Sequence, residues 1–179
     1  RTANRRDFAI APPAPTLLDR AAAAGRATHA IGKIGDIFSM RGIGKLWKGD
    51  SDLDLSQHLM ALAGAAEDGS LTFANFVEFD SLYGHRRDTA GYARALEWFD
   101  TVAGAFLAAL RPGDLALFTA DHGNDPTWPG SDHTRERVPV LGAAPGSGGG
   151  ELGLIPFTGV AARVGRHLRL VPGGGSGGA

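Results

Sequence analysis

Cysteine is absent from the 179-residue chain, so disulfide bonds and thiolate ligands are excluded and any metal site must use histidine and carboxylates. A basic excess is also lacking, because 18 Lys and Arg residues oppose 19 Asp and Glu residues, which argues against binding to nucleic acid. No apolar run approaches the roughly 20 residues of a membrane span. We therefore expect a cytoplasmic protein whose partners include neither nucleic acid nor a membrane.

Glycine is abundant, and 11 of its 27 residues lie in two short segments. Residues 142–153 and 172–179 are of low complexity and have little to pack, which predicts a surface loop and a loose tail. The remaining length suits one domain, or most of one, with a sizeable core. Arg1 stands where an initiator methionine is usual, and we expect the chain to be part of a longer protein.

Strand-like and helix-like segments alternate along the chain. Strands are predicted at residues 27–34, 71–79, 115–119 and 138–142, and helices at 51–66, 90–110 and 157–168. Residues 115–119 are almost wholly apolar, which is typical of a buried parallel strand. This alternation predicts an α/β fold with a mostly parallel sheet that helices cover on both faces.

Two polar clusters follow predicted strands. The first cluster, FDSLYGHRRD at residues 79–88, contains Asp80 and His85, and the second, at residues 119–136, contains Asp121, His122 and His133. In open α/β sheets, binding sites form beyond the carboxyl ends of the strands. Both clusters occupy that position, so we expect them to contribute to one site.

Two carboxylates and three imidazoles form a ligand set that suits divalent cations such as Zn²⁺ or Mn²⁺. Their number favours two metal ions over one closed tetrahedral site, and two ions can hold both oxygens of a phosphoryl transfer. An Asp-His pair in a loop can equally be a solvated turn, and composition alone leaves both interpretations open.

Other polar residues have simpler interpretations. Asp125 and Asp132 stand beside glycine and proline and are interpreted as turn or cap residues. Arg86 and Arg87 could be a solvated pair or could hold a phosphate through paired hydrogen bonds. The three remaining histidines fall within predicted strands and helices and are interpreted as structural or surface residues: His29, His58 and His167.

The segment TADHGNDPTWPGSDHTRERVPVL, residues 119–141, closely resembles the signature of the bacterial phosphopentomutases, a family of the alkaline phosphatase superfamily. The similarity extends to residues 1–10, 31–43 and 75–100, and it covers about residues 1–170 without an obvious break. The related phosphoglycerate mutases have a similar but shorter metal motif. The longer signature therefore identifies the chain with the phosphopentomutases.

This resemblance implies a three-layer core like that of alkaline phosphatase, with a central, mostly parallel sheet. It implies that residues 1–25 are the end of a cap domain and a return linker, that residues 26–170 are the metal-binding core, and that residues 171–179 are a flexible tail. It also implies that the N-terminal half of the enzyme and most of the cap are missing from this chain.

The family interconverts the 1-phosphates and 5-phosphates of ribose and deoxyribose, using two divalent metal ions, usually Mn²⁺, and a phosphothreonine relay. By motif, Asp80, His85 and His133 resemble the ligands of one metal, and Asp121 and His122 resemble ligands of the other. The sugar phosphate is implied as the substrate. Five arginines are implied as residues that contact it: Arg1, Arg5, Arg6, Arg86 and Arg87.

No threonine in this sequence matches the family's nucleophile, since Thr119, Thr127 and Thr134 belong to the metal motif itself. We therefore expect no catalytic nucleophile in this chain and expect it to be inactive without the missing N-terminal half. Three alternatives remain: a member resembling the cofactor-independent phosphoglycerate mutases, a phosphatase of the same superfamily, and a non-catalytic metal-binding remnant.

Overall fold

The structure is a computed structural model that describes residues 10–170. Arg1, Arg5, Arg6 and the glycine-rich tail from residue 172 lie outside the described residues. Along the chain the elements are α1 (Leu17–Ala23), β1 (Thr28–Gly32), α2 (Ile34–Ile37), β2 (Lys45–Trp47), α3 (Asp52–Ala65), β3 (Leu71–Asn75), the π-helix η1 (Phe79–Gly84), α4 (Thr89–Ala108), β4 (Ala116–Thr119), β5 (Val140–Ala143) and α5 (Thr158–His167). Within this part of the chain, no helix has the length and apolar character needed to cross a bilayer.

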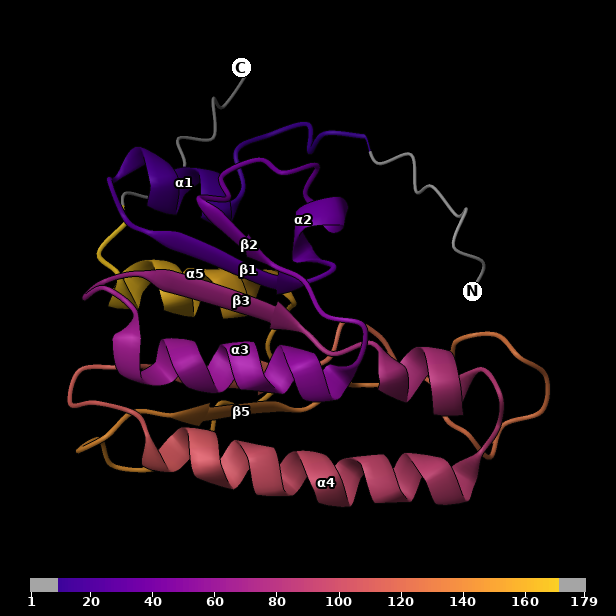
Figure 1. Cartoon of the computed structure of the whole chain (residues 1–179). Coiled ribbons are helices and arrows are strands. Elements are labelled where there is room, and N and C mark those ends of the chain that lie inside the picture. Colours follow the sequence, from indigo (N-terminus) through magenta and orange to yellow (C-terminus); the bar gives the residue numbers. More distant parts are fainter. Residues whose placement is uncertain (1–9, 171–179) are drawn as a thin grey trace.

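The centre of the molecule is a parallel sheet of three strands in the order β2-β1-β3 (Figure 1). Strand β1 lies in the middle, and its first four residues are buried. Because successive side chains of a strand point to opposite faces, Ala30 packs with α1 and α2, whereas Ile31 packs with α3. Helices therefore cover both faces, and the predicted three-layer α/β arrangement is confirmed.

Helix α1 packs directly onto this sheet. Leu18 and Ala21 are buried in one core cluster with Ala30 of β1 and with Leu168, which follows α5. Thr16 begins the helix with a reciprocal capping box to Asp19, which satisfies backbone groups that the first turn leaves free. The segment assigned to the cap domain and linker thus contributes to the core, and its boundary at residue 26 stays a prediction.

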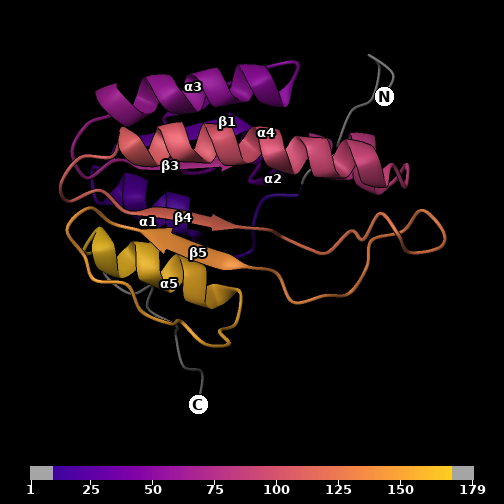
Figure 2. The ribbon, with the colours of Figure 1, turned by 90° about the horizontal axis from the view of Figure 1, so that it is seen from below.

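Strands β4 and β5 form a separate antiparallel pair (Figure 2). The prediction of a buried parallel strand at residues 115–119 is therefore wrong in its pairing, and β4 is only partly buried. The reason lies in the loop between β4 and β5, which turns back on itself. A bridge between Gly123 and Thr134 joins its outgoing and returning arms, so the chain re-enters beside β4 in the opposite direction.

The long helices lie where the periodicity predicts them. Ser51 caps α3 by accepting the Asp54 backbone N–H, and the Asp54 carboxylate bonds back to Ser51. Helix α4 presents Phe99 to the sheet side, where its ring contacts Phe79 of η1 and Phe118 of β4 at centroid distances of 5.7 and 6.3 Å. One aromatic side chain therefore joins the two segments that lead into the polar clusters.

The β3 strand ends at Asn75, short of the predicted limit at residue 79. The buried carboxylate of Asp52, which is 2% exposed, accepts the backbone N–H groups of Val77 and Glu78 at 3.0 and 3.1 Å. Those N–H groups are consequently unavailable to the sheet, and the chain turns into η1 instead. Asp52 thus sets the point at which the segment carrying Asp80 leaves the sheet.

Burial raises the pKa of Asp52 to about 6. A carboxyl whose pKa is higher in the folded than in the unfolded chain stabilises the fold below pH 4 and loses this contribution as pH rises through 6. Relative to an Asp52→Asn variant, the wild-type free energy of unfolding should fall between pH 4 and pH 7, by on the order of 2–3 kcal/mol. Urea denaturation across this range measures the difference, and a difference independent of pH would contradict the assignment.

Candidate metal centre

Two segments bring the predicted ligands to one place. Asp80 lies in η1 and His85 caps its C-terminus, while Asp121, His122 and His133 lie on the loop that connects β4 to β5. Both segments follow the carboxyl ends of their strands, as the sequence predicts. The segment η1 is a π-helical turn, a rare geometry that is frequently found at functional sites.

Asp80 is the centre of the cluster. Its Oδ2 atom lies 3.3 Å from His85 Nε2, and its Oδ1 atom lies 3.2 Å from His133 Nε2. His122 Nε2 lies 3.7 Å from Asp121 Oδ2. All five predicted ligands thus contact another member of the set, and their roles as ligands stay a prediction.

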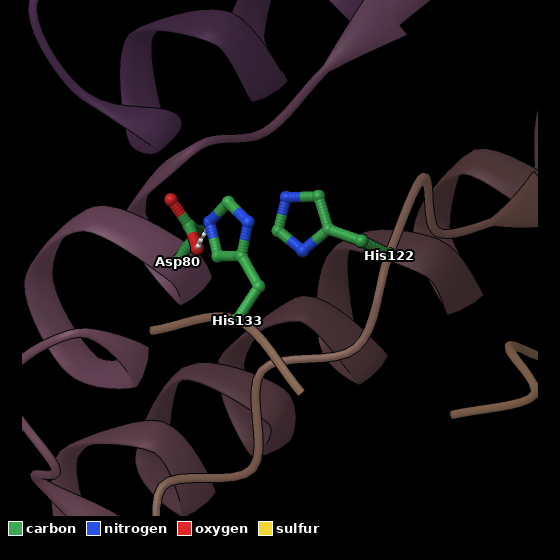
Figure 3. Close-up of side chains that lie close together, drawn as sticks. All are labelled: Asp80, His122 and His133. Atoms are coloured by element: carbon green, nitrogen blue, oxygen red, sulfur yellow. Dashed lines mark ion pairs between the residues drawn. The ribbon is translucent and has the colours of Figure 1, made fainter. Parts of the chain in front are cut away.

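The imidazoles form a continuous stack that joins the two halves of the set. The His133 ring lies between those of His85 and His122, at centroid distances of 4.8 and 3.8 Å. Figure 3 shows Asp80 on one side of His133 and His122 on the other. Ligand atoms of Asp80, His122 and His133 all lie within 4.8 Å of one another, which supports the use of a divalent metal. This tight group takes two members, Asp80 and His133, from one implied ligand set and one member, His122, from the other.

Backbone carbonyls orient two of the imidazoles. The Nδ1–H of His85 donates to the carbonyl of Ser131 at 2.6 Å, and the Nδ1–H of His122 donates to that of Gly123 at 3.2 Å. A hydrogen bond of this kind places the proton on Nδ1 and leaves Nε2 free to bind a metal. Metal-bound histidines usually make such a bond through their other ring nitrogen. Each free Nε2 lone pair then faces a carboxylate, an arrangement that a cation between them stabilises.

The distances also suit a shared ion. Two ligand atoms, each about 2.1 Å from one metal at an angle near the tetrahedral or octahedral value, lie about 3.0–3.4 Å apart. The two contacts of Asp80, at 3.3 and 3.2 Å, fall in this range. The Asp121–His122 contact is longer, and the Asp121 side chain is 75% exposed, so this side of the cluster is the more open one.

One residue of the centre is missing from the sequence-based set. Asn124 is buried, and its Nδ2 group donates to Asp80 Oδ1 at 2.7 Å, which orients the carboxylate. The close approach depends on Gly84, because a Cβ atom there would lie 2.5 Å from that same Nδ2 group. Asn124 stands inside the signature segment, and its position two residues after His122 was the available signal.

The two arginines after His85 differ in their surroundings. Arg86 is exposed, whereas every nitrogen of the Arg87 guanidinium donates to a protein oxygen. Phosphate binding by either residue stays a prediction, and the structure favours Arg86 because its side chain faces solvent.

The remaining histidines lie away from the centre. His29 contacts Glu67 at 3.1 Å, His58 contacts the Lys48 carbonyl at 2.9 Å, and His167 is exposed on α5.

The turn interpretation of Asp125 is confirmed, since its carboxylate accepts the Thr127 backbone N–H and hydroxyl. These bonds lower the pKa of Asp125.

A cleft of about 410 Å³ adjoins the centre and is lined by residues including His122, Asn124, Glu136 and Tyr92. Burial raises the pKa of the Tyr92 hydroxyl, and the negative charges of Glu136 and Asp80 raise it further. The cleft therefore presents a neutral phenol and a carboxylate beside the candidate ligands.

Comparison with known proteins agrees with this geometry. The sequence profile of the Metalloenzyme superfamily matches residues 23–168, a range that contains all five candidate ligands. Phosphopentomutases of Sinorhizobium fredii, Chelativorans sp. and Agrobacterium fabrum are 52%, 53% and 49% identical to the chain over 174 residues. The matched region is 97% of this chain and 43%, 42% and 43% of those relatives, so the chain spans less than half their length.

Metal binding to the folded state should stabilise the chain. At a Mn²⁺ concentration of about 100 times Kd, the gain of about 2.7 kcal/mol corresponds to a rise in Tm of about 5–10 °C. His122→Ala and His133→Ala should each reduce this rise, whereas His167→Ala, a change at an exposed position of α5, should leave it intact. Differential scanning fluorimetry measures the shifts, and equal shifts in all three variants would mean that Mn²⁺ acts non-specifically.

Proposed function

The chain belongs to the Metalloenzyme superfamily, and from this membership we propose that it supplies the metal-binding part of a phosphopentomutase. The observation that carries the proposal is the contact of Asp80 with two imidazoles, at 3.3 and 3.2 Å, in a segment shared with relatives of that name. The substrate would be ribose or deoxyribose phosphate, with the phosphoryl group exchanged between the 1-hydroxyl and the 5-hydroxyl. We expect this reaction to take place in the cytoplasm.

Two divalent ions, Mn²⁺ in the first instance, are proposed as the cofactors. Asp80, His85 and His133 would hold one ion, and Asp121 and His122 would hold the other. When bound, the ions would supply positive charge that stabilises the oxygens of the transferring phosphoryl group. The stack of imidazoles would keep the two ligand sets next to each other, because His133 contacts both His85 and His122.

The relay nucleophile would come from outside the described residues. Three hydroxyls close to the ligands in sequence already bond within the protein. Thr134 accepts the Asp125 backbone N–H, the Thr119 hydroxyl contacts the Ala120 carbonyl, and the Ser81 hydroxyl donates to the Val77 carbonyl. A phosphoryl group that leaves one sugar oxygen must rest on an enzyme side chain before it joins the other. We therefore propose that this chain holds and orients the reacting groups while another segment carries the phosphoryl group.

Arg86 is proposed to contact the substrate. Its guanidinium is exposed one residue after His85, where it could pair with phosphate oxygens. Arg1, Arg5 and Arg6 remain proposed contacts of the sugar phosphate, outside the described residues.

The chain alone should not interconvert ribose 1-phosphate and ribose 5-phosphate, even with saturating Mn²⁺, because it lacks the relay. Joining it to the part of the Sinorhizobium fredii relative that it does not match should restore the reaction. An Asp121→Asn substitution in that fusion should reduce kcat by about 100-fold or more, since it removes a ligand charge but keeps the side-chain shape. A coupled assay for ribose 5-phosphate measures the rates.

The products that the fusion forms distinguish the proposed mutase from the alternative functions. Release of inorganic phosphate without isomerisation would favour a phosphatase, and interconversion of phosphoglycerates would favour the related mutases. Robust mutase activity of the unfused chain would contradict the relay argument. Mn²⁺ binding with no turnover in the fusion would favour a non-catalytic remnant.

A further inference from the structure

Arg87, two residues after the candidate ligand His85, adopts an unusual backbone conformation. Its φ angle is +55°, in the left-handed region that costs a residue with a side chain roughly 1 kcal/mol relative to glycine. Such strain persists only where surrounding contacts hold it in place. The contacts of the Arg87 side chain therefore show which segments this backbone conformation helps to hold together.

The guanidinium of Arg87 joins the end of η1 to the loop between β4 and β5. Its Nη1 group also bonds the Gly84 carbonyl at 3.0 Å, so it holds its own turn as well. Its partners on the loop are the Asn124 side-chain oxygen at 2.6 Å, the Asp125 carbonyl at 2.8 Å, the Asp132 carbonyl at 2.6 Å and the Gly130 carbonyl. One planar group thus fixes both arms of the loop against η1.

Two of these partners lead directly to candidate ligands. Asn124 accepts from Arg87 and donates through Nδ2 to Asp80 Oδ1 at 2.7 Å, so its amide is oriented from both ends. Asp132 immediately precedes His133, whose ring contacts the same carboxylate oxygen at 3.2 Å. Arg87 therefore acts on the spacing between Asp80 and His133 without touching either.

The charge of Arg87 would act against a neighbouring cation. A guanidinium close to a metal site repels the ion, so on electrostatic grounds its removal should tighten metal binding. The geometric contribution has the opposite sign, because loss of residues that orient metal ligands typically weakens metal binding 10- to 100-fold. The sign of the change in affinity distinguishes the two effects.

We propose that Arg87 is a positioning residue of the metal centre, which holds the loop 124–132 against η1 so that Asp80 and His133 meet at ligand spacing. The inference rests on the proposed metal site. It also gives Arg87 a role distinct from the phosphate contact proposed for its exposed neighbour Arg86.

Isothermal titration calorimetry of the full chain with Mn²⁺ tests this role. Arg87→Ala and Arg87→Gly both remove the guanidinium. The glycine variant should have the higher Tm of the two in EDTA, because glycine adopts the positive φ angle without strain. Both variants should bind Mn²⁺ about 10-fold or more weakly than wild type. If Arg87 served stability alone, both variants would have a lower Tm than wild type but, at a temperature where they are folded, would bind Mn²⁺ as wild type does.

Two further variants complete the test. Arg94→Ala removes an equal charge from an exposed position on α4 and should leave the Mn²⁺ affinity within about twofold. Arg87→Lys keeps the charge without the planar fork and should bind Mn²⁺ almost as weakly as Arg87→Ala. Unchanged or tighter binding in the folded Arg87 variants would overturn the proposal. Absence of Mn²⁺ binding by the wild type would instead refute the metal site itself.

Discussion

The contact of one carboxylate, Asp80, with two imidazoles is the interaction on which the candidate site depends. Its oxygens lie 3.3 Å from His85 and 3.2 Å from His133, and Asn124 donates to it as well. These partners come from two segments that lie more than 35 residues apart, so the site exists only where the loop packs on η1. Other parts of the fold position the segments that carry this contact without touching Asp80. Asp52 sets where β3 ends, and Phe99 packs η1 and β4 against one helix.

Much of this arrangement can be predicted from the sequence, because it follows from local patterns. A capping residue and apolar periodicity predict α3, and the long amphipathic run predicts α4. The positions of Asp80 and Asp121 after two apolar runs predict that their clusters share one side of the sheet, since the carboxyl ends of the strands form binding sites in such folds. The neighbouring proline correctly predicts that Asp125 is a turn residue, whereas the choice of ligands rests on the resemblance and stays a prediction.

The remainder depends on contacts between distant residues, which local patterns do not contain. The antiparallel pairing of β4 follows from a loop that turns back on itself, and residues 115–119 have the same apolar character in either pairing. The early end of β3 depends on Asp52, 25 residues before Val77. The partners of Arg87 on the loop lie 37 or more residues ahead, so its sequence neighbourhood does not predict them.

Anomalous diffraction from crystals grown with Mn²⁺ would show directly whether these side chains hold divalent cations. We expect one anomalous peak about 2.2 Å from ligand atoms of Asp80, His85 and His133, and a second beside Asp121 and His122. Strong peaks only at other surface carboxylates, with none within this cluster at saturating Mn²⁺, would contradict this expectation.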